Sequence, residues 1–277
     1  MIYNHKALIL GLVAGMFGLC CRTATSRPTS TPDLAAGSLA APLAMLGTHA
    51  SRERLLAEDP LAFLRACRLH YDETITDYRC RFIKEERING KLGPEQEMNV
   101  LFREEPFSVD LVWTENPGRA KHVSYVQGRW VDDGHEMMLA VPSGVLGLLV
   151  PGGVKRPING KAALARSRKP ISNFGYKNSL DLIIKFCEMA RDHSQYRLEY
   201  LGVVDHHGRD AYLLERVLPY TGEGGVYPDR LLRIYIDTEW LVPTGIYAYM
   251  DDEATTPLGK YLLLDPEFNV GLSNRDF

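Results

Sequence analysis

From residue 78 on, strand patterns take over the sequence: apolar and polar side chains alternate, as in the first half of residues 78–88, which is typical of strands with one buried face. This alternation predicts about ten strands in two runs, with a segment of different character between the runs. Short turns connect the strands within each run, so we expect antiparallel meanders rather than β-α-β units. The predicted strands are residues 78–88, 96–103, 107–113, 122–126, 136–141, 196–204, 211–217, 231–237, 245–250 and 259–264.

Apolar residues at helical spacing predict helices in two places. The first is residues 51–71, with a break where Asp59 suits an N-cap and Pro60 suits the first position of a new helix. The second is residues 179–193, which carry an apolar stripe from Leu180 to Ala190. Residues 143–165 hold many glycines and two prolines. They are predicted to form a long loop with some helix, packed over one end of the sheet.

These elements together define a fold class. A sheet of about ten antiparallel strands tends to curl into a barrel or an incomplete barrel. Asn89-Gly90 supplies a strong hairpin signal after the first strand, because both turn residues need a positive φ. We therefore predict an α+β fold: a large curved antiparallel sheet, shaped as a half-barrel, with two or three helices covering its concave face.

The N-terminal region differs from the rest of the chain. His5 and Lys6 precede an apolar stretch that is too short and too rich in glycine for a membrane-spanning helix. A positive start and a short apolar core are typical of a secretory signal, so residues 1–21 are predicted to direct export. The stretch ends at Cys20 and Cys21. Either cysteine is a candidate for acylation of the lipoprotein type; the alternative is that both belong to the apolar leader.

Composition defines the remaining organisation. Residues 22–50 are rich in Ser, Thr, Pro, Ala and Gly and are predicted to be a disordered tether, whereas residues 51–277 are predicted to be a single domain. The protein is expected to be periplasmic or anchored by its N-terminus in the cell envelope. The formal net charge is −3, and without a long basic run the chain is not expected to bind nucleic acid. Cys67, Cys80 and Cys187 form either one disulfide and a free thiol, or three buried thiols.

Polar clusters along the chain favour turns over catalytic or metal sites. Residues 205–210 (DHHGRD) contain potential metal ligands, but they lie between two predicted strands and favour a hairpin turn. Residues 132–135 (DDGH) are interpreted in the same way, and residues 84–87 (KEER) as a solvated strand face. Ser143 lacks the surroundings of a nucleophile elbow. We therefore predict no catalytic residues, no metal site and no cofactor.

Aromatic side chains on alternating strand positions are the candidate ligand-binding residues. They either fill the core or line an apolar cavity, since small-molecule sites are themselves mostly apolar. The apolar piece at residues 145–150 suits a lid or a membrane-touching element, and the alternative is a short buried helix. The candidate ligand-binding residues are Phe82, Phe102, Trp113, Tyr125, Tyr212, Tyr235 and Tyr261.

Four segments of the chain resemble a known bacterial family, the domain of unknown function 1571. They are residues 77–92 (DYRCRFIKEERINGKL), 103–111 (REEPFSVDL), 156–158 (RPI) and 264–277 (LDPEFNVGLSNRDF). The resemblance runs from about residue 60 to the end of the chain, and one departure is Asp110, where an aromatic or apolar residue is expected. The family is similar to the LolA/LolB-type lipoprotein-carrier superfamily. That resemblance implies a LolA-like half-barrel whose apolar cavity, covered by helices, binds acyl chains.

The functional expectation combines the leader, the strand count and the resemblance. We expect a non-enzymatic envelope protein that binds or carries a lipid or another apolar ligand, although one fold can host many functions. One alternative is a structural or interaction module of the cell envelope, which would expose a patch rather than enclose a cavity. A second is a metal-dependent hydrolase using residues 205–210, which would bind metal stoichiometrically and lose it in His206→Ala or His207→Ala.

Overall fold

The computed structural model describes residues 46–165 and 167–277. The predicted signal sequence, Cys20, Cys21 and most of the predicted tether lie outside the described residues. The helices are α2 (His49–Glu58), α3 (Pro60–Thr74), α4 (Gly144–Leu149), α5 (Lys161–Leu164) and α6 (Tyr176–Ala190), with a 3-10 turn, η1 (Ile171–Asn173). The strands are β1 (Asp77–Ile88), β2 (Lys91–Leu92), β3 (Gln96–Arg103), β4 (Ser108–Glu115), β5 (Ala120–Val126), β6 (Val131–Asp132), β7 (His135–Pro142), β8 (Val154–Pro157), β9 (Arg197–His206), β10 (Arg209–Val217), β11 (Leu231–Asp237), β12 (Pro243–Tyr249) and β13 (Pro257–Phe268).

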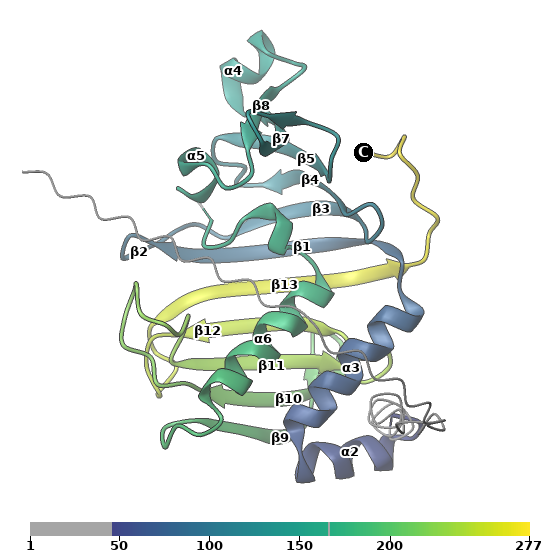
Figure 1. Cartoon of the computed structure of the whole chain (residues 1–277), viewed down its shortest axis with the longest axis vertical. Coiled ribbons are helices and arrows are strands. Elements are labelled where there is room, and N and C mark those ends of the chain that lie inside the picture. Colours follow the sequence, from purple (N-terminus) through teal and green to yellow (C-terminus); the bar gives the residue numbers. More distant parts are fainter. Residues whose placement is uncertain (1–45, 166) are drawn as a thin grey trace, which may run out of the picture.

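All thirteen strands belong to one open antiparallel sheet (Figure 1). Its order is β6-β7-β5-β4-β3-β1-β13-β12-β11-β10-β9, with β2 paired to β1 and β8 paired to β7. The predicted α+β class and curved antiparallel sheet are confirmed, but the prediction of about ten strands was too low. The missed strands, β2, β6 and β8, have two to four residues each, too few to show an alternating pattern.

Helices α2, α3 and α6 lie against the half of the sheet formed by β9 to β13, called the helix half below (Figure 1). The predicted break is confirmed: the Asp59 side chain accepts the Ala62 N–H at 2.9 Å and Pro60 begins α3. Helix α2 begins at His49, earlier than expected, and buried Leu46 belongs to the same apolar cluster. The packed core therefore includes residues before position 51. No helix in the described residues is long and apolar enough to cross a membrane.

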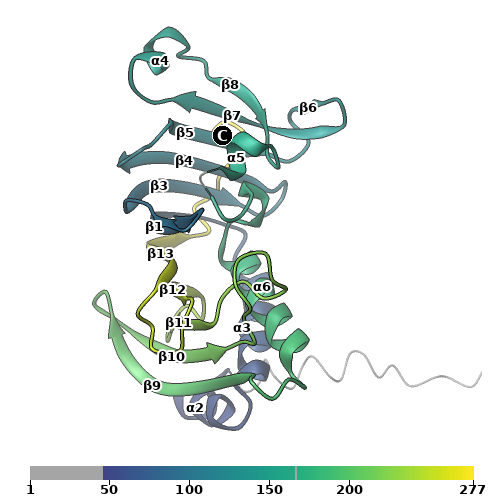
Figure 2. The same ribbon diagram turned by 90° about the vertical axis from the view of Figure 1, so that its left-hand side faces the viewer.

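The other half of the sheet, formed by β1, β3, β4, β5 and β7, is called the cavity half below. Its cover is the segment from residue 143 to 175, which contains α4, β8, α5 and η1. Figure 2 shows α5, α6 and α3 on the same side of the curved sheet. The predicted loop over one end of the sheet is confirmed, and it also contributes the short strand β8. The concave face of the sheet is therefore covered by helices on one half and by the segment 143–175 on the other.

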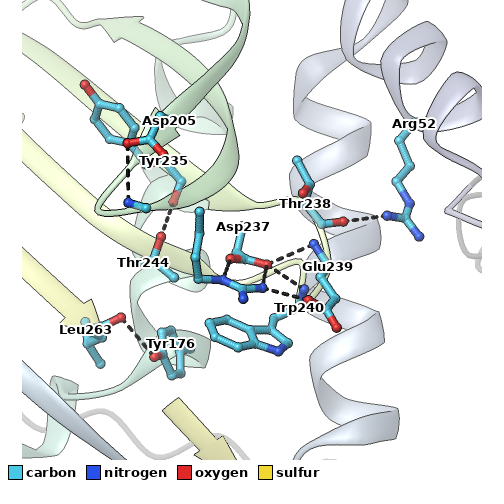
Figure 3. A network of polar contacts seen from close by, with 12 residues as sticks. Arg52, Tyr176, Asp205, Tyr235, Asp237, Thr238, Glu239, Trp240, Thr244 and Leu263 are labelled. Carbon is cyan, nitrogen blue, oxygen red and sulfur yellow. Dashed lines mark hydrogen bonds and ion pairs between the residues drawn. The ribbon is translucent and has the colours of Figure 1, made fainter. Parts of the chain in front are cut away.

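A polar network joins α2 to the turn between β11 and β12 (Figure 3). Asp237 is almost fully buried and accepts two backbone N–H groups of the turn, each at 2.9 Å. Arg209 donates to the same carboxylate at 2.6 Å and stacks on the Trp240 ring, 3.6 Å from its centroid. Arg52 of α2 donates to the Thr238 carbonyl at 2.6 Å. These bonds fix α2 to the sheet, which is a structural role.

Asp110, the one departure from the family pattern, lies on the outer face of the sheet, opposite to the core. Strand alternation turns Val109 and Leu111 to the core and Asp110 away from it. On the outer face Asp110 bonds the His122 Nε2 at 2.7 Å, across the β4–β5 pair. The hydrogen bond that the His122 ring donates to the Asp110 carboxylate raises the pKa of His122 above its usual value. An aspartate is accommodated here because a partner histidine compensates for its loss of water.

Candidate ligand-binding cavity

A cavity of about 780 Å³ lies between the cavity half of the sheet and the covering segment 143–175. The sheet contributes an apolar wall from alternating inward positions of successive strands. That wall includes Phe82, Met98, Leu111, Trp113, Val123 and Met138. The cover closes the opposite side with Leu146, Ile158, Ala163, Ile171 and Phe174. The concave face is therefore only partly filled by its own side chains.

The cavity exists because small side chains and short elements face each other there. Ala120 and Ala140 on the sheet and Ala163 and Ala165 on the cover line it, and none reaches across the gap. The cover is built from four-residue and six-residue elements joined by Gly- and Pro-rich turns, so it presents no long apolar stripe. On the helix half, long side chains of α3 and α6 close the space instead.

One end of the cavity is polar. Strand alternation along β1 places Lys84 and Glu86 on the same inward face as Phe82. Lys84 Nζ lies 3.0 Å from Glu86 Oε2, and the two side chains are only 12% and 6% exposed. The Tyr261 hydroxyl donates to the Glu86 carboxylate at 2.9 Å, and the Arg168 backbone N–H donates to the same carboxylate at 3.2 Å. The prediction of a solvated strand face at residues 84–87 is therefore wrong for Lys84 and Glu86.

The charges of this lining are mostly positive. Glu86 is the one carboxylate among the lining residues, and Lys84 already pairs with it. Lys169 Nζ lies 5.6 Å from the centroid of the Tyr261 ring, and Arg119 and Arg156 also line the cavity. Within the described residues these three cations form no ion pair. Burial raises the pKa of Tyr261, and the negative charge of Glu86 raises it further. The Tyr261 hydroxyl therefore stays protonated and remains a hydrogen-bond donor.

The predicted ligand-binding residues fall in two groups. Phe82, Trp113 and Tyr261 line the cavity, and their contact with a ligand stays a prediction. The remaining four lie elsewhere. Phe102, Tyr125 and Tyr212 are buried within apolar clusters, and Tyr235 is turned to the outer face. Alternation identified inward positions correctly for six of the seven, but it carries no signal for which inward positions face open space.

The polar clusters at residues 205–210 and 132–135 form turns, as predicted. His207 and Gly208 both have positive φ between β9 and β10, and so do Asp133 and Gly134 between β6 and β7. The His206 ring folds over the sheet and covers a glycine of β12. In the described part of the chain, no group of three or more His, Cys, Asp or Glu side chains is arranged to hold a metal.

The three cysteines of the domain are free and buried, which agrees with the second of the two expected arrangements. Burial raises the pKa of Cys67, Cys80 and Cys187, so their thiols stay protonated. A protonated thiol is a weak nucleophile. These cysteines therefore act as small apolar core residues.

Comparison with known sequences adds a family. A family model described as "Protein of unknown function (DUF1571)" matches residues 75–277. No protein with curated function matches the sequence.

Solved structures of low sequence identity match about four fifths of the chain. A DUF1329 family protein from Desulfovibrio piger is 14% identical with a TM-score of 0.38, covering 79% of this chain and 97% of its own. The lipoprotein LppX from Mycobacterium tuberculosis is 13% identical with a TM-score of 0.40, covering 78% and 99%. A LolA superfamily protein from Nitrosomonas europaea is 10% identical with a TM-score of 0.31, covering 77% and 96%. All three TM-scores are below 0.5, and the function proposed below rests on the cavity itself.

Proposed function

We propose that this chain, which belongs to the DUF1571 family of proteins of unknown function, binds a lipid or another apolar molecule in its cavity without performing chemistry on it. The observation that carries the proposal is an unfilled concave face lined mainly by apolar side chains. A volume of about 780 Å³ lies within the range of roughly 300–1,000 Å³ typical of small-molecule sites. An acyl chain lying along Leu111, Trp113 and Met138 would remove apolar surface from water on both partners.

The polar end of the cavity suggests the chemistry of the ligand's head group. The charge of Glu86 is already paired with Lys84, and its carboxylate accepts a hydrogen bond from Tyr261. A cationic ligand would therefore find no unpaired carboxylate at Glu86. Lys169 beside Tyr261 has no carboxylate partner among the described residues, and a negatively charged group would supply one. We therefore propose an amphiphile with an acidic head group near Lys169 and an apolar chain along the sheet. In an exported protein, such binding suits a carrier or envelope role.

Native mass spectrometry of the full chain tests occupancy first. A co-purifying lipid at near-stoichiometric amount, identified after organic extraction, would support the proposal. A clean apo mass, with no uptake of oleate or of oleyl alcohol on addition, would contradict it and favour the envelope interaction module.

A cavity-filling variant locates the ligand. Ala140→Trp places a large ring in the space between β7 and the cover, so oleate uptake is expected to fall at least about tenfold because the ring occupies the site. Leu201→Trp, on the exposed face of β9, is the matched control and should bind as the unaltered chain does. Unchanged binding by Ala140→Trp would place the ligand outside this cavity.

A pair of ligands with the same chain length tests the head group. Lys169→Gln is expected to weaken oleate binding about tenfold, the usual size of a charge-assisted hydrogen bond, and to leave oleyl alcohol unchanged. Lys185→Gln, exposed on α6, is the control for a general change in charge. Equal losses for both ligands would mean that Lys169 acts through packing and does not recognise charge.

A further inference from the structure

Helix α4 exposes almost all of its apolar side chains. Val145, Leu146, Leu148 and Leu149 are 73%, 63%, 77% and 72% exposed. The inner side of the helix is Gly147, where an added Cβ would lie 2.1 Å from the Pro142 carbonyl oxygen. The helix backbone therefore packs directly on the end of β7, and the four apolar side chains stay largely exposed. Figures 1 and 2 both show α4 at one extreme end of the molecule, beyond β8. We call residues 144–150 the α4 tip.

The segment that carries the α4 tip has a charge opposite to that of the rest of the chain. Residues 137–180 contain seven Lys and Arg and no Asp or Glu. Of the 32 Lys and Arg in the chain 25 remain elsewhere, against all 35 Asp and Glu. The net charge of −3 therefore conceals a strongly basic segment in an otherwise acidic protein. We call residues 137–180 the basic segment.

Exposed cations lie beside the exposed leucines. Lys155 and Arg156, on β8, are exposed and follow α4 after a short turn. Lys121 of β5 reaches the foot of the helix, with its Cε 3.6 Å from the point where a Cβ on Gly147 would lie. In the residues that the structure describes, no carboxylate pairs with these three side chains. They remain available to an external anion.

We propose that the α4 tip and the cations around it dock on a bilayer that contains anionic lipids, with Leu148 and Leu149 inserted among the acyl chains. Interfacial membrane binding combines burial of apolar side chains with attraction between basic residues and anionic head groups, and this surface supplies both. Leu146 belongs to the α4 tip and also lines the cavity, so docking brings the cavity rim to the lipid surface. Docking of the α4 tip on a membrane does not depend on which ligand the cavity binds.

Vesicle flotation of the full chain tests docking. All proteins carry Cys20→Ser and Cys21→Ser, so that an acyl anchor does not contribute. Binding is expected to vesicles of phosphatidylcholine with phosphatidylglycerol, and at least tenfold more weakly to phosphatidylcholine alone. The double change Leu148→Ser with Leu149→Ser, and separately Lys155→Glu with Arg156→Glu, should each reduce binding at least tenfold. Leu201→Ser, at an exposed leucine on β9, is the matched control and should bind normally.

A fluorescent probe separates the α4 tip from any contribution of the N-terminal region. With Leu148→Trp, emission should shift to the blue on adding anionic vesicles, because the indole leaves water. With Leu201→Trp, it should not shift. Flotation without a shift at position 148 would overturn the proposal, because another part of the chain would then hold the membrane. Equal binding to neutral vesicles would overturn the role of charge.

Two further outcomes distinguish this inference from the cavity proposal. Concentration-dependent dimerisation that is lost with Leu148→Ser and Leu149→Ser, without vesicle binding, would show that α4 pairs with a second copy and would overturn docking. Oleate uptake from solution should be unaffected by these two changes, since neither residue lines the cavity. Failure of uptake with intact vesicle docking would reject the cavity proposal alone.

Discussion

At the scale of single residues, His206 is a histidine held out of water at the end of β9. It is 8% exposed and stacks on the Tyr235 ring with centroids 4.2 Å apart. Its Nε2 lies 3.4 Å from the Tyr247 hydroxyl, and its Nδ1 has no hydrogen-bond partner in the described residues. Burial, helped by the neighbouring charge of His207, lowers the pKa of His206 to about 4.

This pKa predicts a loss of stability in mild acid. An unfolded histidine titrates near pH 6.5, so between about pH 6.5 and about pH 4 the unfolded chain binds more protons than the folded one. The free energy of unfolding should therefore fall by about 3 kcal/mol across that window, and this residue should lower it no further at more acidic pH. His206→Phe keeps the stacked ring and removes the titration. Urea unfolding of both proteins at several pH values measures the difference, and parallel curves would contradict the assignment.

At the scale of elements, the start of α6 depends on one glycine. Gly175 precedes the helix with φ of 107°, a backbone conformation that favours glycine. A Cβ there would lie 3.0 Å from the Phe102 ring and 3.1 Å from the Tyr78 hydroxyl. Gly175 and Ser179 also line the cavity, so the position of α6 sets one end of the candidate site.

Gly175→Ala is therefore expected to destabilise the fold by more than about 1 kcal/mol, because backbone strain adds to the close contact with two buried rings. Gly152→Ala is the matched control: it lies in a turn with no atom within 4 Å of an added Cβ. It should change stability by less than about 0.5 kcal/mol. Equal effects of the two substitutions, in urea unfolding, would show that Gly175 is not required at this helix start.

At the scale of the whole molecule, the last strand in sequence lies near the middle of the sheet. Strand β13 pairs with β1 on one side and with β12 on the other, and so joins the two meanders. Tyr261 and Leu263 of the same strand line the cavity. Folding of the cavity half therefore depends on residues from both ends of the domain.

Deletion of residues 257–277 should leave β1 and β12 as unpaired edges and abolish the cooperative fold, since exposed edges favour aggregation. Deletion of residues 273–277 alone removes only the end of the chain beyond β13 and should leave a folded protein. Circular dichroism during heating distinguishes the two results. A cooperative melt of the longer deletion would mean that the two halves fold independently.

Much of the fold was predictable from local pattern. Period-two alternation identified ten of the strands, and Asp59-Pro60 marked the start of α3 because capping and the first helical turn are local chemistry. Asn89 and Gly90 have the positive φ values that their turn requires. The two-residue strands were missed because their pairing is decided by the neighbouring strand, not by their own residues.

The candidate site was predictable only in part. Alternation shows that Phe82 and Phe102 share the inward face, but the space opposite each residue depends on segments far away in the sequence. Phe102 meets buried Tyr78, 4.7 Å between ring centroids, whereas Phe82 faces the cavity. In the same way, Lys84 and Glu86 form an ordinary charged run in sequence. They become a buried pair only because Tyr261 and Arg168 pack over β1.

The sequence by itself therefore determined the elements of this protein: its antiparallel strands, its main helices, its turns and its family. These depend on side-chain periodicity and on backbone chemistry that acts over a few residues. Only the tertiary structure decided that one half of the concave face is filled by helices and the other half is left open, that the cavity carries surplus positive charge, and that the leucines of α4 remain exposed. Each of these depends on the volume and charge of segments that the fold brings together from distant parts of the chain.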